Sequence, residues 1–342
     1  MATYKATKGL KVQSLASDLT ASSTTTGEVW YNTTSNVIKY VAEGGGAWAT
    51  GGAMNTGRFN QGCSGASNTA ALIFAGYNNN PSAVYYALTE SYNGTSWTEV
   101  ADVTRATGRG TVTGFGSQTS AIVAGGNPPA TTALTESWSG TSWTEVGDLN
   151  NGRDTMASAG TANTAGIVFG GTYGTPPPAN FYLKVTETWN GSAWTEVGDL
   201  NIGRQQMASA AQGSSTATLC IAGELDTPYS PRVAAYVESW NGTSWTEVAD
   251  LTTARQNMAG AGVSTDAMCF GGDTAPTNQL TESYNGTSWT EVADLATGIM
   301  ANGGSGTSAS AISMGGNTPP ASVVTEVWNS PAGLETVTFT DS

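Results

Sequence analysis

The sequence contains no histidine, and only 11% of its 342 residues are charged. Without histidine, the chain cannot form Ser-His-Asp or Cys-His catalytic arrangements or any metal site that uses an imidazole. Its three cysteines, Cys63, Cys220 and Cys269, are far apart in the sequence, so they predict neither a disulfide framework nor a zinc-ligand spacing. We interpret them as small core residues, and we expect no metal, no cofactor and no enzymatic activity.

Long apolar runs are also missing. No stretch approaches the roughly 20 apolar residues that a membrane-spanning helix needs, and the first ten residues lack the apolar segment of a secretory signal. The net charge of −14, from 26 acidic and 12 basic residues, predicts repulsion from nucleic acid and from anionic membranes. Lys5, Lys8 and Lys11 are concentrated near the start, where a solvated arm is a simpler interpretation than a docking site for an acidic partner.

The chain is an internal repeat. The phrase from Thr89 to Asp102 recurs without change from Thr281 to Asp294. Six tryptophans recur at spacings of 44 to 51 residues: Trp48, Trp97, Trp143, Trp194, Trp245 and Trp289. A period of this length is typical of β-propellers.

Each repeat contains four strand-like runs, which are clearest in the third. These runs, with glycines or polar residues between them, are Arg153–Ala159, Gly166–Gly171, Val185–Gly191 and Ala193–Val197. The Asn-Gly pair before the last run predicts a tight hairpin in which both turn residues take positive φ. Four antiparallel strands, none able to bury its apolar face alone, are typical of one propeller blade.

Counting the parts predicts the number of blades. The apolar run ending in Gly-Gly or a variant occurs six times, and so does the tryptophan-bearing run, but Trp48 precedes the first complete repeat. We therefore predict an all-β, six-bladed propeller closed by exchange of the N-terminal strand, in which the strand around Trp48 completes the blade formed by residues 299–329. The predicted organisation is an extended arm (1–26), a β-hairpin (27–46), the propeller (47–329) and a C-terminal strand or tail (330–342).

The repeats follow the order arginine, apolar strand with Gly-Gly, aromatic-Asn-Gly turn, tryptophan. This order resembles the kelch-type propeller repeat across about residues 47–329. The first aromatic position is held by Tyr92, Trp138, Trp189, Trp240, Tyr284 and Trp328. The second is held by Trp97, Trp143, Trp194, Trp245 and Trp289. This resemblance implies a fold and says little about function.

The N-terminal segment has a different resemblance. Gly27–Tyr40, followed by Ala47–Ala49, is similar to a hairpin of bacteriophage tail and fibre proteins, and Met1–Lys11 resembles the start of virion proteins from phages of marine bacteria. The resemblance implies a virion component made in the host cytoplasm and released on particles. It also implies that the N-terminal arm contacts other virion proteins.

Carboxylates recur at fixed places in the repeats. Glu99 and Asp102, for example, have counterparts in four other repeats. Because catalysis needs carboxylates in differing environments, we interpret these as architectural. Three aspartates precede an arginine by five residues, which predicts charge-assisted bonds that hold each blade to the next. The predicted pairs are Asp148–Arg153, Asp199–Arg204 and Asp250–Arg255. Ile299 replaces the arginine in the last repeat.

The segments between the second and third strands differ most among the repeats, and three of them are long. Aromatic and polar side chains in these three segments are the candidate ligand-binding residues: Tyr77, Asn79, Tyr85, Tyr86, Tyr173, Phe181, Tyr182, Asp226, Tyr229 and Arg232. Aromatic rings stack on sugars while polar neighbours bond their hydroxyls. The alternative is that these aromatics pack the loops onto the propeller or onto a second copy of the chain.

Two function classes follow. The first is a tail fibre or receptor-binding component whose propeller contacts a host-surface glycan or receptor. The alternative is a head or tail decoration protein with a purely structural role. A cellular adaptor is less consistent with the phage-like start, and neither class requires catalysis.

Overall fold

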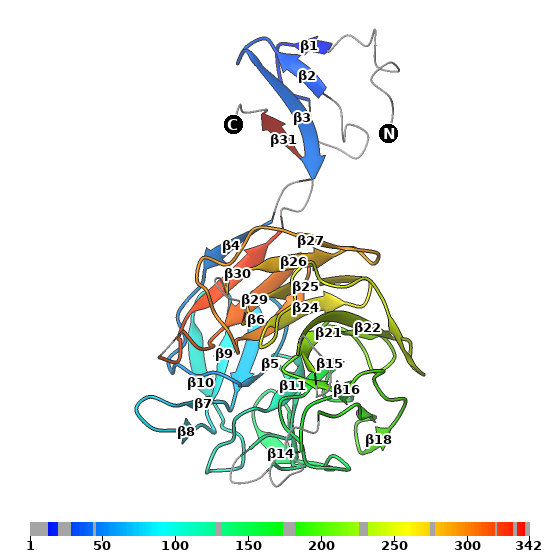
Figure 1. Ribbon diagram of the computed structural model, residues 1–342. Coiled ribbons are helices and arrows are strands. Elements are labelled where there is room, and N and C mark those ends of the chain that lie inside the picture. The colour runs from blue at the N-terminus through cyan, green and yellow to red at the C-terminus, as the bar shows by residue number, and fades with distance from the viewer. Residues whose placement is uncertain are drawn as a thin grey trace. The chain divides into compact units, whose positions relative to one another are not determined.

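The computed structural model describes residues 13–19, 29–43, 46–127, 131–173, 182–225, 232–273, 278–318, 320–330 and 334–338, and these contain strands and no helix. The chain divides into two compact units (Figure 1). The larger unit is Ala47–Asn329, and the smaller combines Met1–Gly46 with Ser330–Ser342. Both chain ends therefore belong to the same unit.

The smaller unit contains one four-stranded sheet. Its strands, in spatial order, are β1 (Gln13–Leu15), β2 (Val29–Asn32), β3 (Val37–Glu43) and β31 (Leu334–Thr338). β1 is parallel to β2, and the other two pairs are antiparallel. Residues 13–15 thus join a sheet through their backbone, although the sequence placed them in an extended arm. Gln13 and Ser14 are exposed, so no apolar alternation signals this strand.

The larger unit consists of six antiparallel blades. Blade 1 is β5 (Gly62–Ser67), β6 (Ala70–Phe74), β9 (Thr89–Tyr92) and β10 (Trp97–Val100), with a small hairpin of β7 (Tyr77–Asn78) and β8 (Val84–Tyr85). Blade 2 is β11 (Thr113–Ser117), β12 (Ser120–Ala124), β13 (Thr135–Trp138) and β14 (Trp143–Glu145). Blade 3 is β15 (Ala157–Ala162), β16 (Ala165–Phe169), β17 (Thr186–Trp189) and β18 (Trp194–Glu196).

The remaining blades follow the same order. Blade 4 is β19 (Arg204–Gln205), β20 (Ala208–Ser209), β21 (Thr218–Leu225), β22 (Val233–Trp240) and β23 (Trp245–Glu247). Blade 5 is β24 (Ala259–Val263), β25 (Asp266–Phe270), β26 (Thr281–Tyr284) and β27 (Trp289–Glu291). Blade 6 is β28 (Gly303–Thr307), β29 (Ser310–Met314), β30 (Thr325–Asn329) and β4 (Ala47–Thr50).

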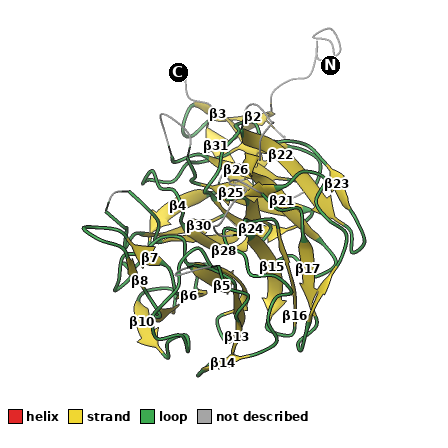
Figure 2. Cartoon of the chain, turned by 60° about the horizontal axis from the view of Figure 1, so that its bottom comes forward, coloured by secondary structure: helices red, strands yellow, loops and turns green. Residues whose placement is uncertain are grey.

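The propeller is closed by the exchange that the sequence predicted. β4 pairs antiparallel with β30, and Trp48 lies opposite Trp328. The inner strands β5, β11, β15, β20, β24 and β28 contact one another in a complete cycle. Several of them surround the middle of the propeller in Figure 2. The all-β, six-bladed fold is therefore confirmed.

The hairpin before each tryptophan strand forms by a different turn from the one predicted. In blade 3, Trp189 lies opposite Trp194, so the loop has four residues. Only Gly191 in this loop has positive φ, at 93°. The Asn190 side chain instead accepts hydrogen bonds from the backbone amides of Ser192 and Ala193, both 2.9 Å long. Asparagine here caps the turn with its side chain.

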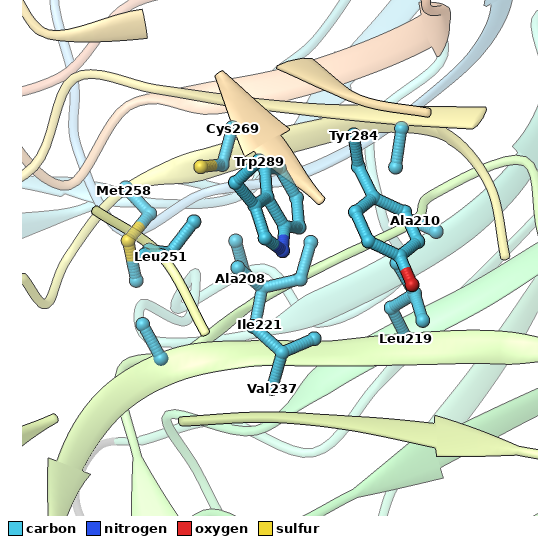
Figure 3. Packing of buried hydrophobic residues seen from close by; sticks show 12 residues of the cluster. Ala208, Ala210, Leu219, Ile221, Val237, Leu251, Met258, Cys269, Tyr284 and Trp289 are labelled. Carbon is cyan, nitrogen blue, oxygen red and sulfur yellow. The ribbon is translucent and has the colours of Figure 1, made fainter. Parts of the chain in front are cut away.

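The hydrophobic core is divided into six clusters, one at each interface between neighbouring blades. Figure 3 shows the cluster between blades 4 and 5, where Trp289 and Tyr284 pack near Ala208, Ile221 and Val237. A six-fold division of the core explains how a chain of this length folds without one large core.

A tryptophan hydrogen bond repeats at five of these interfaces. The indole Nε1 of each last-strand tryptophan donates to a threonine on the third strand of the preceding blade, as Trp245 does to Thr186 at 3.0 Å. The other four pairs are Trp48–Thr281, Trp97–Thr325, Trp143–Thr89 and Trp194–Thr135. In blade 4, Val237 takes the place of the threonine, and Trp289 Nε1 is buried without a partner. Buried polar groups are nearly always paired, so the sixth interface carries a local defect.

Candidate functional site

Two segments of every blade meet at the face where the inner strands begin. The residue after each Gly-Gly pair, or its variant, bridges to the residue that follows the arginine position of the repeat. Examples are Phe59 with Tyr77, Asp154 with Thr172, and Gln256 with Asp273. At Gly171, a Cβ atom would lie 2.4 Å from the carbonyl oxygen of Asp154, so glycine permits this close approach. We refer to this side of the propeller as the loop face.

A ring of strained residues lies at the start of the six inner strands. At this position, each blade has a non-glycine residue with φ between 51° and 56°. These residues are Asn60, Thr111, Thr155, Gln206, Asn257 and Ala301, and we refer to them as the αL ring. Positive φ is unusual for threonine because it is β-branched. Conformations of this kind persist only where the surroundings enforce them, and they cluster at functional sites.

Backbone hydrogen bonds hold the αL ring together. Each bond runs from the amide of one ring residue to the carbonyl oxygen of the next, for example from Ala301 to Asn257 at 2.7 Å. Four similar bonds of 2.9 to 3.1 Å join Asn60 to Ala301, Asn257 to Gln206, Gln206 to Thr155, and Thr155 to Thr111. These five bonds connect the six blades in order around the axis, and no bond between Thr111 and Asn60 closes the circle among the described backbone hydrogen bonds.

The αL ring surrounds a cavity of about 130 Å³. All six ring residues line it and are half-exposed, so the cavity reaches solvent at this level. The residue that follows each αL-ring residue is buried, and its side chain packs into the interface with the preceding blade. Blades 2 to 5 place Val112, Met156, Met207 and Met258 there. Blades 6 and 1 place Asn302 and Gln61 there.

The irregular inner segment of blade 4 crosses the channel beyond the cavity. Ala211 lines the cavity, and its carbonyl oxygen accepts a hydrogen bond from Gly160 of blade 3. The amide of Gln212 donates to Gly262 of blade 5 at 2.9 Å, and its side chain donates to Gly65 of blade 1 at 2.7 Å. Blades 1 and 4 are opposite in a ring of six, so this segment spans the axis and closes the cavity on one side.

The predicted aspartate-arginine bonds are wrong. Arg153 forms its ion pair with Glu187 of its own blade, with 2.7 Å between Nη2 and Oε1. Arg204 and Arg255 likewise pair with Glu238 and Glu282, as do Arg58 with Glu90 and Arg109 with Glu136. All five arginines are fully buried. Asp148 instead accepts a hydrogen bond from the backbone amide of Thr135, and neither Asp199 nor Asp250 forms an ion pair among the described residues.

The arginines pair with glutamates and not with the predicted aspartates because the arginines are buried. Each guanidinium points into its own blade and also donates to a backbone carbonyl, as Arg153 does to Val185 at 3.0 Å. Burial lowers the pKa of Arg153, and the neighbouring Glu187 opposes that effect. A surface aspartate cannot reach this position, whereas the third-strand glutamate is itself buried and can. We missed this glutamate because it lies 34 residues from its partner.

Blade 6 lacks this ion pair because Ile299 replaces the arginine. Its glutamate, Glu326, is still buried. Its two carboxylate oxygens accept hydrogen bonds from the backbone amides of Ala296 and Thr297, at 2.8 and 2.9 Å. The glutamate position therefore anchors the connecting segment even where no arginine is present.

The candidate ligand residues of blade 1 form an aromatic stack on the loop face. Tyr77 packs against Phe59 and Tyr85, with ring centroids 4.2 and 5.2 Å away. Tyr77, Tyr85 and Tyr86 are half-buried, and Asn79 is exposed. The hydroxyl of Tyr77 accepts a hydrogen bond from Asn60 of the αL ring at 3.4 Å, so this stack contacts the rim of the cavity.

The candidate residues of blades 3 and 4 form a separate polar cluster. Tyr182 is buried, donates to Glu224 at 2.9 Å and accepts from Arg232 at 2.6 Å. Arg232 also forms an ion pair with Glu224 at 2.9 Å. Gln205 links Glu224 to Thr155 of the αL ring. Tyr182 therefore packs one loop against another, as the alternative interpretation of these aromatics expected.

The other candidate residues contribute less to the described site. Tyr173 is 43% exposed. Phe181, Asp226 and Tyr229 lie outside the described residues. The structure thus brings the predicted residues to two places on the loop face, both adjoining the cavity rim, and not to one site. The αL-ring residues, which line the cavity, were missed.

Burial shifts the pKa of several side chains in the described residues. Burial raises the pKa of Cys63 and Cys269 to about 11 and that of Cys220 to about 12, so these thiols stay protonated at neutral pH. Burial also raises the pKa of Asp154, which accepts a hydrogen bond from Asn127. No group of three Cys, Asp or Glu side chains able to hold a metal occurs in the described part of the chain. The same residues contain no helix that could span a membrane.

Comparison with known proteins supports the fold. No model of a known family matches the chain, and no curated protein matches it. A solved structure described as the structure of YjhT is similar, with a TM-score of 0.65 and 12% identity, over 84% of this chain and 100% of that one. At this identity the similarity shows the β-propeller fold alone.

Proposed function

We propose that this chain is a bacteriophage virion component, a tail-fibre or receptor-binding protein whose propeller binds a host-surface glycan through the loop face. The observation that carries the binding role is the αL ring and the cavity inside it. The interfaces between blades repeat, but this face differs from blade to blade, and binding residues commonly lie in such variable segments. The phage assignment comes from the resemblance of residues 1–49.

The smaller unit fits the role of attachment in this proposal. Its sheet combines strands from both chain ends, and those ends lie outside the propeller unit. A separate sheet of this kind provides a surface for contacts with other virion proteins. Catalysis is not part of the proposal, because the chain has no histidine and its described thiols are protonated.

A decoration protein is the second candidate. The burial of Tyr182 and the stacking of Tyr77 favour it, because these aromatics pack within the propeller and are not fully available for a ligand.

The proposal is tested on particles. Gold-labelled antibody against the whole chain should mark the tail or its fibres in electron micrographs, and purified chain should block adsorption of particles to host cells. Label spread over the head, without any block of adsorption, would support the decoration protein instead. Absence of label from every particle would exclude both.

A further inference from the structure

Blade 6 lacks the turn that joins the last two strands of every other blade. In the other five blades, a four-residue turn joins the third strand to the last, as between Trp189 and Trp194 in blade 3. In blade 6, Trp328 and Trp48 hold the equivalent positions, but β30 and β4 come from opposite ends of the propeller unit. A strand that is not joined to its partner by a short loop has no local connection to bring it back after it detaches.

The exchanged strand β4 also has the least buried tryptophan among the last strands. Trp48 is half-buried, whereas the equivalent tryptophans of the other five blades are only 5–6% exposed. The other three residues of β4 are exposed. Blade 6 also lacks the buried arginine, because Ile299 takes its place. Segments with few buried contacts open at a low cost in free energy, so β4 is the last strand that should detach most readily.

The two segments that form the β4–β30 pair meet a second time. β3 and β31 are antiparallel partners over five residue pairs, the first of which is Glu43 with Leu334. Only residues 44–46 connect β3 to β4, and only residues 330–333 connect β30 to β31. The second pairing therefore follows at the point in the chain where the other blades have their turn.

We propose that the pairing of β3 with β31 is a clasp that replaces the missing turn of blade 6 and keeps the propeller closed. While the clasp is formed, a detached β4 stays tethered to β30 through two short connections, and short linkers give effective concentrations in the millimolar range. The coupling is reciprocal, so a closed propeller also favours the clasp. This inference concerns closure of the ring and does not depend on the proposed glycan-binding function.

Two consecutive prolines in β31 test the clasp. Alternate residues of an antiparallel strand donate to a given neighbour, so Thr336→Pro with Val337→Pro removes at least one donor from the pairing with β3. Hydrogen–deuterium exchange of the whole chain then compares β4 with β18, the last strand of blade 3. The amides of Ala47–Thr50 should exchange at least about tenfold faster than in the wild-type chain, and those of Trp194–Glu196 should change less than about twofold.

The strand β1 offers a matched control, because it is the other edge of the same sheet. Gln13→Pro with Ser14→Pro disturbs the pairing of β1 with β2 and leaves the sequence of the clasp unchanged. Exchange in β4 should then change less than about twofold. Unchanged exchange in β4 of the β31 variant, equal acceleration in β4 and β18, or the same acceleration in the β1 control would overturn the inference.

A second variant locks the clasp in a folded chain. Val41 lies opposite Thr336, and opposite residues of antiparallel strands have Cα atoms about 4.5–5.5 Å apart, which suits a disulfide in the variant Val41→Cys with Thr336→Cys. Burial raises the pKa of the native thiols to about 11 or 12, so the introduced pair is the one expected to oxidise. The β4 amides should exchange at least about threefold more slowly in the oxidised variant than in the reduced one. Equal exchange in the two states would contradict the inference.

Discussion

The loop face differs from the interfaces between neighbouring blades. The interfaces repeat the same residues from blade to blade, whereas the residues of the loop face vary. At the interfaces, one set of contacts recurs around the ring: an aromatic pair, a Trp-Thr hydrogen bond and, inside the blade, a buried Arg-Glu pair. On the loop face, equivalent positions carry Phe59, Asp154 and Met300, among others. The repeated residues thus stabilise the propeller, and the varied positions on the loop face are available for binding. Blade 6, which lacks the arginine, provides a natural comparison within the same chain.

The largest expected effect concerns the buried ion pairs. Glu187→Gln leaves the guanidinium of Arg153 buried without its carboxylate, which should lower the free energy of unfolding by about 3–5 kcal/mol. Glu326→Gln in blade 6 leaves no arginine unpaired and should cost only about 1 kcal/mol. Urea denaturation of the two variants checks this difference. Equal losses would mean that the arginines do not depend on the glutamates.

The Trp-Thr bond can be removed from one interface and added to another. Thr186→Val leaves Trp245 Nε1 unpaired and should destabilise the chain by about 1–3 kcal/mol. Val237→Thr offers Trp289 Nε1 an acceptor and should stabilise it by about 0.5–1.5 kcal/mol. Thermal melts followed by tryptophan fluorescence provide the measurement. A loss of stability in the second variant would show that the valine is required for packing.

Replacing Asp148 or Asp199 should change the free energy of unfolding only slightly, because neither aspartate pairs with an arginine among the described residues. Asp148→Ala removes one hydrogen bond to the amide of Thr135, so we expect a loss of about 1 kcal/mol or less. Asp199→Ala should have a smaller effect still. Urea midpoints for both variants, beside that of Glu187→Gln, decide between the observed pairing and the one the sequence predicted. A cost for Asp148→Ala as large as that for Glu187→Gln would restore the original pairing.

The smallest expected effect depends on pH. Burial raises the pKa of Asp154 above its unfolded value, so the ionised side chain disfavours the folded state, and this penalty develops as pH rises through the range between the two values. Asp154→Asn should therefore stabilise the chain at pH 7, and the gain should vanish as pH falls below about 4. Melting temperatures across this range, with Asp266→Asn as an exposed control, test the sign. A gain that is constant with pH would contradict it.

Much of the fold could be predicted from the sequence because its signals recur. The period, the four strands per blade and the exchanged strand at Trp48 all follow from counting tryptophans and Gly-Gly pairs. The ion pairs could not be predicted in the same way. Asp148 is five residues from Arg153 and Glu187 is much farther along the chain, but strand pairing brings the distant residue into the blade.

The candidate site was predictable only in outline. Differences in loop length pointed to the loop face, which stays a prediction as a binding face. The αL ring has no compositional signature, because asparagine, threonine, glutamine and alanine all occupy it. The cavity inside the ring becomes evident only after the blades are arranged in space, because its lining comes from all six of them.

The most direct measurement of the central claim, that the loop face binds a host-surface glycan, is the crystal structure of the whole chain soaked in a host-surface oligosaccharide that blocks adsorption. We predict density for the sugar on the loop face, inside or beside the αL ring. A sugar bound only on the outer strands or on the smaller unit would contradict the claim.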